Sequence, residues 1–145
     1  MGWVARMAQR RPADWMLAFE ALLLLSAFRL ALAWIPASTI LGRLTRGGRS
    51  ESVDNLTTRQ MLIARRVQWA VSAAARHSPV NFVCFPQALA GYWMLRRRGV
   101  SATLVYGVAR SETAELQAHT WLSVGETIIL GGEAAERFTP MDRWT

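Results

Sequence analysis

The sequence has no lysine, one cysteine and two histidines among its 145 residues. A single cysteine excludes an intramolecular disulfide framework and indicates a reducing compartment, so we expect a cytoplasmic protein. The histidines and the cysteine are too few and too scattered for a zinc site, and we expect neither a metal nor another cofactor. All positive charges are arginines, and the net charge of +7 favours an acidic partner of a class that charge alone does not define.

Long uncharged apolar runs are also scarce. The region from Trp15 to Ile35 is strongly apolar, but Glu20 and Arg29 flank an uncharged run of only eight residues. A membrane-spanning helix needs about 20 predominantly apolar residues, and no signal-peptide cleavage site follows the region cleanly. We therefore interpret it as a core helix that starts near Pro12 and is stopped by Pro36, and we set membrane association aside as a minor alternative.

The remaining composition is that of one folded domain. A hydrophobic fraction of 52% excludes disorder, and 145 residues are enough for one core but too few for two. A polar segment around residues 47–52 marks the boundary between a helical N-terminal segment, residues 1–50, and a core, residues 54–145. Both belong to a single domain of residues 1–145.

Helix signals dominate the first two thirds of the chain. A short helix is expected after Ser38, which is placed to cap it. Thr57 and Gln60 form a capping box ahead of an apolar stripe with helical spacing. A third helix is predicted from Gln87 to Arg98, and Gly99 stands where a left-handed C-terminal cap belongs.

The spacing of apolar residues changes from helical to alternating after this third helix. Residues 102–108 and 118–124 are predicted to be strands. Gly125 and Glu126 fit a two-residue type II′ turn, after which residues 127–130 return antiparallel. Helices followed by a small antiparallel sheet predict an α+β fold.

The only cysteine, Cys84, lies directly before the third helix. Pro86 suits the first turn of that helix because its missing N–H costs nothing there. The sulfur is therefore expected beside unpaired N–H groups and the positive end of the helix dipole, which favours thiolate over thiol. A lone cysteine is also commonly a small buried hydrophobe, so a partner base is needed to indicate catalysis.

His119, on the second predicted strand, is the candidate for that base. A strand holds an imidazole rigidly, as a general base that later acts as a general acid requires. Trp121 shares its face and would exclude water and orient the ring, although both residues are equally compatible with a core. His77 ends the second predicted helix, and we interpret it as a capping or surface residue.

A third group usually orients such a base. A regular hairpin puts Gly132 opposite His119 and leaves no acid on that face. The nearest carboxylate is Glu133, which a bulge at the glycine pair would swing into place, and Asp142 is a more distant candidate. A backbone carbonyl or a water is the remaining alternative, and it would leave a Cys–His dyad.

Several segments taken together resemble a known family. They are Cys84-Phe85-Pro86-Gln87-Ala88-Leu89-Ala90, Leu95-Arg96-Arg97-Arg98-Gly99-Val100, Tyr106-Gly107-Val108 and Ala118-His119-Thr120-Trp121-Leu122. With the apolar helix before them and the later Arg137–Met141 segment, they are similar to the transglutaminase-like leader peptidases of lasso-peptide biosynthesis. The resemblance spans nearly the whole chain, and its specificity comes from the cysteine element followed at this distance by His-x-Trp.

The resemblance implies a transglutaminase- or papain-like core in which the cysteine-bearing helix packs on the sheet. It also implies a cysteine protease that removes the leader from a ribosomally made precursor, with Cys84 as nucleophile and His119 as base. The family's acid falls about a dozen residues past the histidine. That position is near Gly131 here, so an orienting role for Glu133 departs from the family's pattern.

The family acts with a separate leader-binding protein and an ATP-dependent cyclase, and no leader-recognition domain is visible ahead of residue 50. In the peptidase, Gln87 and Trp121 are candidate substrate or oxyanion contacts. One alternative is a catalytically idle adaptor that holds the same partners. Binding to nucleic acid is not expected, because the arginines are dispersed and no aromatic-basic motif accompanies them.

Overall fold

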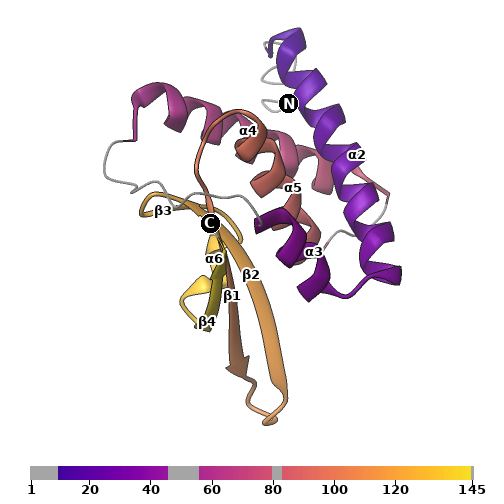
Figure 1. Ribbon diagram of the computed structural model, residues 1–145, viewed down its shortest axis with the longest axis vertical. Coiled ribbons are helices and arrows are strands. Elements are labelled where there is room, and N and C mark those ends of the chain that lie inside the picture. Colours follow the sequence, from indigo (N-terminus) through magenta and orange to yellow (C-terminus); the bar gives the residue numbers. More distant parts are fainter. Residues whose placement is uncertain (1–9, 46–55, 80–82, 145) are drawn as a thin grey trace, which may run out of the picture.

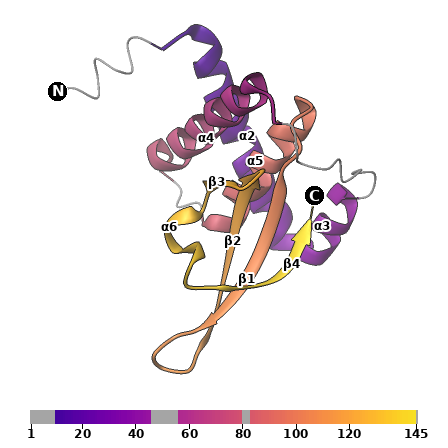
Figure 2. The same ribbon diagram turned by 90° about the vertical axis from the view of Figure 1, so that its left-hand side faces the viewer.

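The computed structural model describes residues 10–45, 56–79 and 83–144, and it has the α+β architecture that the sequence predicts. Its elements are, in chain order, α2 (Pro12–Trp34), α3 (Ala37–Thr45), α4 (Thr58–His77), α5 (Cys84–Arg97), β1 (Thr103–Arg110), β2 (Leu116–Val124), β3 (Thr127–Leu130), α6 (Gly132–Ala135) and β4 (Thr139–Trp144). The strands form one antiparallel sheet in the order β3-β2-β1-β4. The long helices gather at one end of the molecule, and the β1–β2 hairpin projects away from them (Figure 1). The view turned by 90° shows the same projection (Figure 2).

α2 is one unbroken helix of 23 residues with the boundaries that its prolines predict. Pro12 lies in the first turn, where a missing N–H is no loss. Ile35 is extended, as a residue before proline usually is, and the helix ends at Trp34. Leu17, Ala21 and Leu25 are the buried apolar residues of the helix, and they belong to the main core.

α3 begins two residues earlier than expected. It starts at Ala37, so Ser38 lies inside the helix and does not cap it. The Pro36 carbonyl accepts the N–H groups of Thr39 and Ile40 at 3.0 and 3.3 Å, and it thereby makes the first backbone bonds of the helix.

The capping box of α4 is confirmed. Thr57 Oγ1 accepts the Gln60 N–H at 3.2 Å, and Gln60 Oε1 accepts the Thr57 N–H at 3.0 Å. The buried residues of the helix follow the predicted stripe and are Ala64, Val67, Ala70, Val71, Ala73 and Ala74. On another side of the helix, Arg66 forms an ion pair of 2.9 Å with Asp14, which ties α4 to α2.

α5 ends in a Schellman motif built around the predicted glycine. Gly99 has a φ of +71°, its N–H bonds to the Arg96 carbonyl, and the Val100 N–H bonds to the Leu95 carbonyl. The middle of the helix touches the sheet closely at Gly91. A Cβ there would lie 2.6 and 2.8 Å from the ends of the Leu130 and Leu122 side chains.

The β2–β3 hairpin has the predicted turn but not the predicted register. Val124 pairs with Thr127, and Gly125 has the positive φ (+62°) that a type II′ turn needs. Ser123 then pairs with Ile128, but Leu122 pairs with Leu130, so Ile129 is an extra residue. The bulge therefore lies earlier than the glycine pair at which the sequence analysis placed it.

β4 was missed by the sequence analysis. It lies at the edge of the sheet beside β1, and five of its six residues are exposed. The strand also carries Pro140 and a register shift opposite Tyr106 and Gly107. With no alternation of apolar and polar residues, a strand of this kind leaves no periodic signal.

The two faces of the sheet bury different clusters. Leu104, Leu122 and Val124 join the main core with residues of α2, α4 and α5. The opposite face carries a small cluster of Val105, Trp121 and Ala135, with Phe138 packed against it. Side chains of neighbouring residues on β2 therefore enter different cores, and this division determines where His119 points.

Candidate active site

Cys84 is the first residue of α5, and its side chain is half-buried. The preceding residue, Val83, is extended and provides no side-chain cap. The first N–H groups of a helix have no intrahelical carbonyl to bond with, so this end presents donors close to the sulfur. The helix thus begins three residues before the predicted start at Gln87, and the cysteine lies in its first turn.

The imidazole of His119 has one defined hydrogen-bond partner. Its Nε2 lies 2.7 Å from the carbonyl oxygen of Gly131. A carbonyl oxygen only accepts, so Nε2 carries the proton and donates it. In a neutral ring the lone pair is then on Nδ1, the nitrogen that is left to act as a base.

Two aromatic rings hold the imidazole in place. The Trp121 ring lies 6.1 Å from it between centroids at an interplanar angle of 26°, and the Phe138 ring lies 5.1 Å away at 30°. Trp121 is itself 7% exposed and packs with Val105 and Ala135. The ring of His119 is therefore held by stacking as well as by its hydrogen bond.

Gly131 supplies the carbonyl because of an unusual backbone conformation. Its φ is +76°, and it stands directly before α6. A Cβ at this position would lie 2.7 Å from the backbone oxygen of Thr120. Both the positive φ and the close backbone approach require glycine. The residue whose carbonyl accepts the hydrogen bond from His119 therefore cannot easily carry a side chain.

The middle of the helix that carries Cys84 and the ring of His119 contact different faces of the sheet. α5 packs on the face of Leu122, whereas His119 stacks with Trp121 and Phe138 on the other face. Within residues 10–45, 56–79 and 83–144, no hydrogen bond joins the thiol to the imidazole. The ring lies on the N-terminal part of β2, before the residues that pair with β3, and Gly131 approaches the strand there at Thr120.

The predicted orienting acids lie elsewhere. Glu133 is exposed on α6, and the described residues show no hydrogen bond from it to the imidazole, whose Nε2 is taken by Gly131. The backbone carbonyl that the sequence left open as an alternative therefore occupies that place. Asp142 is exposed on β4 opposite Tyr106.

The other candidates have varied surroundings. Trp121 lies beside His119, as its place on the strand predicts. Gln87 is half-buried in the first turn of α5 and makes other polar contacts. His77 is exposed at the end of α4, in agreement with a surface role. In the described part of the chain, no three His, Cys, Asp or Glu residues are grouped so as to hold a metal.

Sequence reasoning missed two residues of this site. Phe138 contacts the imidazole although it is 19 positions further along the chain, and nothing in its local pattern indicates this. Gly131 was noted only as the position at which an acid was absent. The two adjacent glycines were the available signal, because a glycine pair commonly marks a backbone that approaches another chain segment closely.

A comparison with family models gives one match, which covers most of the fold. A model described as "Transglutaminase-like superfamily" matches residues 22–143, a range that includes Cys84, His119 and Gly131. No curated protein and no solved structure matches the chain.

Proposed function

Because the chain belongs to the transglutaminase-like superfamily, which commonly includes cysteine proteases, we propose that it is a cysteine peptidase that uses Cys84 and His119. Its substrate would be a ribosomally made lasso-peptide precursor, from which it removes the leader. The observation that carries the proposal is the family match across both residues, together with a cysteine in the first turn of a helix. The motif resemblance supplies the finer assignment to leader removal.

The chemistry follows from the two side chains. The thiolate of Cys84 attacks the scissile carbonyl and forms a carbon–sulfur bond, and N–H groups at the start of α5 stabilise the oxyanion. His119, the base that has taken the thiol proton of Cys84, gives this proton to the leaving amine. It then takes a proton from water, which hydrolyses the thioester and restores the thiol.

The Gly131 carbonyl takes the part of the orienting acid in this proposal. It accepts a hydrogen bond from Nε2, with 2.7 Å between the nitrogen and the carbonyl oxygen. Nδ1 is then left to exchange protons with the sulfur. In this proposal Cys84 approaches the scissile bond from the first turn of α5, and His119 approaches it from β2.

The proposed partners are a separate leader-binding protein that presents the precursor and an ATP-dependent cyclase that closes the macrolactam ring. The proposed location is the cytoplasm, and the reaction as written uses no cofactor. Gln87 and Trp121 remain candidate contacts for the substrate, Gln87 from the first turn of α5 and Trp121 from beside the imidazole.

One observation favours a second function, that of an idle adaptor. The thiol and the imidazole are not hydrogen-bonded in the described structure, and no carboxylate orients the ring. Such a protein would hold the leader-binding protein and the cyclase together without cutting the precursor.

The experiment that separates the two functions uses Cys84→Ala. The purified chain, its leader-binding protein and the precursor are mixed, and cleavage is followed by mass spectrometry. A peptidase loses cleavage by a factor on the order of 10⁴ or more when the nucleophile is removed. Val83→Ala, an exposed neighbour without chemistry, is the matched control. Unchanged cleavage by Cys84→Ala would refute the peptidase.

A further inference from the structure

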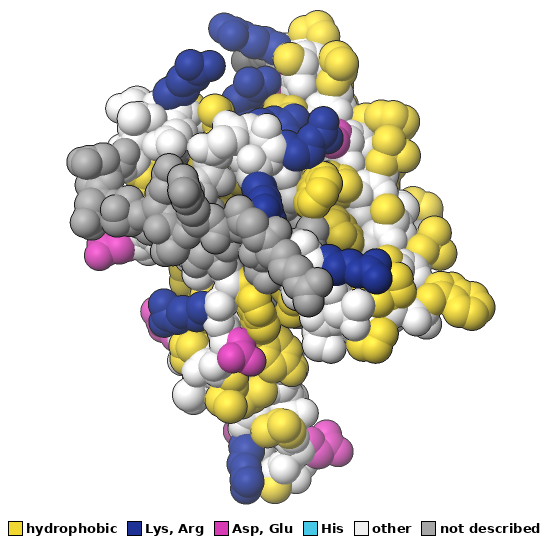
Figure 3. Space-filling model, in the orientation of Figure 1, with side chains coloured by type: hydrophobic (Ala, Val, Ile, Leu, Met, Phe, Trp, Pro, Cys, Tyr) yellow, Lys and Arg dark blue, Asp and Glu magenta, His cyan; other side chains and the backbone are white. Residues whose placement is uncertain are grey.

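The outer face of α2 is apolar along its whole length. Its exposed large side chains are Trp15, Met16, Phe19, Leu23, Leu30 and Trp34. Arg29 is the one exposed polar side chain within α2. The space-filling view shows these apolar side chains gathered over α2, with arginines near its N-terminal end (Figure 3).

α2 is long and apolar enough to cross a membrane, and only 11% of its most apolar 18-residue window is buried. Burial inside the domain therefore does not explain its composition. A helix that is apolar all round is normally surrounded by apolar material, either a protein core or lipid. Here α4 and α5 cover one side, and the other side is not covered by any of the residues that the structure describes.

The helix is nevertheless part of the folded domain. Asp14 pairs with Arg66 of α4 at 2.9 Å, and Glu20 accepts hydrogen bonds from Arg98 at 2.6 and 3.2 Å. Charged groups packed against one side of a helix prevent it from spanning a bilayer. α2 can therefore only lie along a membrane surface, with its outer face in the interfacial region.

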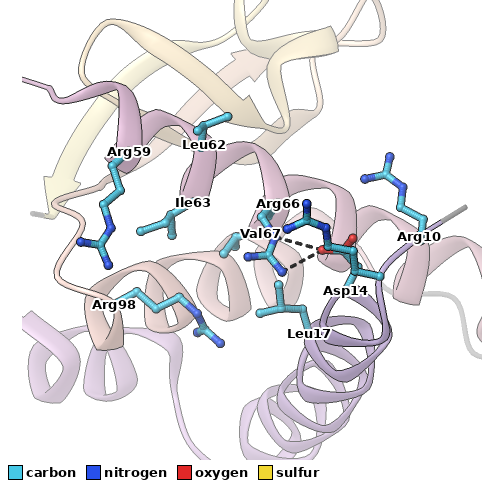
Figure 4. Close-up of a pocket in the computed structure, with 10 residues that line it drawn as sticks. Arg10, Asp14, Leu17, Arg59, Leu62, Ile63, Arg66, Val67 and Arg98 are labelled. Atoms are coloured by element: carbon cyan, nitrogen blue, oxygen red, sulfur yellow. Dashed lines mark hydrogen bonds and ion pairs between the residues drawn. The ribbon is translucent and has the colours of Figure 1, made fainter.

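The charged side chains near the N-terminal end of this face are mostly arginines. Near the N-terminal end of α2 lies a cavity of about 890 Å³, lined by five arginines and a single acid. The acid is Asp14, whose carboxylate is already paired with Arg66 (Figure 4). The arginines are Arg10, Arg11, Arg59, Arg66 and Arg98, and the apolar floor includes Leu17 and Val67. A second hollow beside it, lined by Trp15, Phe19 and Leu23, runs along α2.

We propose that the outer face of α2, with the arginine cluster at its N-terminal end, docks on an anionic lipid bilayer. Phosphate headgroups would occupy the arginine-lined cavity, and the tryptophan, phenylalanine and leucine side chains would enter the interfacial region. The proposal does not depend on the peptidase activity, because none of these residues belongs to the candidate active site.

Charge and polarity argue against the other occupants. A second copy would bring the same arginine cluster against itself if the two chains met through an isologous contact. A protein partner would need hydrogen-bonding groups in the contact, since protein interfaces carry about one hydrogen bond per 100–200 Å². The outer face of α2 offers a single polar side chain over its length.

The test is flotation of the full chain with lipid vesicles. The chain is expected to float with vesicles of phosphatidylcholine that contain phosphatidylglycerol and to bind much less to pure phosphatidylcholine. Phe19→Glu with Leu23→Glu should lower the partition coefficient by about a hundredfold, because burial of each such side chain contributes roughly a factor of ten or more. Arg11→Gln and Arg59→Gln should each lower it by about fivefold, and high salt should reduce their effect.

Leu116→Glu is the matched control, because Leu116 is as exposed (71%) as Phe19 (62%) but lies far along the β1–β2 hairpin. Circular dichroism and thermal unfolding confirm that each variant is folded. Flotation of the Phe19 and Leu23 variant at the level of the unaltered chain would overturn the proposal. So would a chain that ignores anionic vesicles but forms dimers, or binds an acidic protein, through Phe19 and Leu23.

Discussion

The imidazole of His119 is fixed by groups that come from three places in the chain. Trp121 stacks on it from the same strand, and Phe138 stacks on it from the segment after α6. The Gly131 carbonyl oxygen accepts a hydrogen bond from its Nε2 at 2.7 Å. A carboxylate would add a full negative charge at this place, whereas a carbonyl offers only its dipole. The orientation of the ring is thereby retained without a charged partner.

The first prediction concerns the pairing of thiol and imidazole. We expect His119→Ala to lower the rate of Cys84 alkylation by iodoacetamide at neutral pH by about tenfold, because the thiolate loses its partner. Glu133→Gln should leave the rate within about twofold, since Glu133 is exposed and does not hold the ring in place. The rate is measured by mass spectrometry of the modified chain.

The outcome is informative in both directions. An alkylation rate that His119→Ala leaves unchanged would show that the two side chains do not meet. A loss in Glu133→Gln as large as that in His119→Ala would show that the carboxylate, and not the Gly131 carbonyl, orients the ring.

The position of α5 is decided at its two ends and in its middle. The Schellman motif at Gly99 ends the helix, Pro86 lies within its first turn, and Gly91 lets the helix approach the sheet. The closest contacts of this approach are with Leu122 and Leu130. How closely α5, and with it Cys84, approaches the sheet therefore depends on Gly91, which has no side chain.

A prediction for this element follows from the space around Gly91. Gly91→Ala should lower the free energy of unfolding by about 1–2 kcal/mol, because overpacking costs about 1–3 kcal/mol and helix propensity returns up to about 1 kcal/mol. Gly42→Ala is the control: a Cβ there meets nothing within 4 Å, so the change should stabilise by about 0.5–1 kcal/mol. Urea denaturation measures both. Equal shifts in the two variants would contradict a close contact between α5 and the sheet.

At the scale of the whole molecule, α2 is attached to the rest by a core strip and by ion pairs. The ion pairs join Asp14 to Arg66 of α4, and Glu20 to Arg97 and Arg98 at the end of α5. Both carboxylates of α2 are therefore paired with arginines of the same domain. The charge left at the edge of its outer face is then that of arginines, which is the basis of the proposed contact with anionic lipid.

The prediction at this scale tests that attachment. Asp14→Asn should lower the free energy of unfolding by about 1–2 kcal/mol, because the amide oxygen of asparagine can still accept a bond from Arg66 but lacks the negative charge that forms the ion pair. The cost stays moderate because Arg66 is 45% exposed and can be hydrated. Glu112→Gln, in the exposed β1–β2 loop, should change stability by less than about 0.5 kcal/mol. A similar result for both variants in urea denaturation would refute the structural role of Asp14.

Local signals in the sequence determined most of the helices and the central hairpins. The prolines at 12 and 36, the Thr57–Gln60 capping box, Gly99 and the Gly125 turn act through the backbone of their immediate neighbours. Each could be read from the chain because the interaction that it makes spans only a few residues. The same holds for Cys84 at a helix start and for Trp121 beside His119.

Only the tertiary structure decided the features that depend on distant contacts. They are the bulge at Ile129, the edge strand β4, the stacking of Phe138, the carbonyl bond from His119 and the face of the sheet on which that ring lies. It also decided that one side of α2, which composition alone had suggested was core, is exposed among the described residues. The physical reason is common to all of these: burial and long-range hydrogen bonding depend on which segments meet, whereas caps and turns depend on adjacent residues.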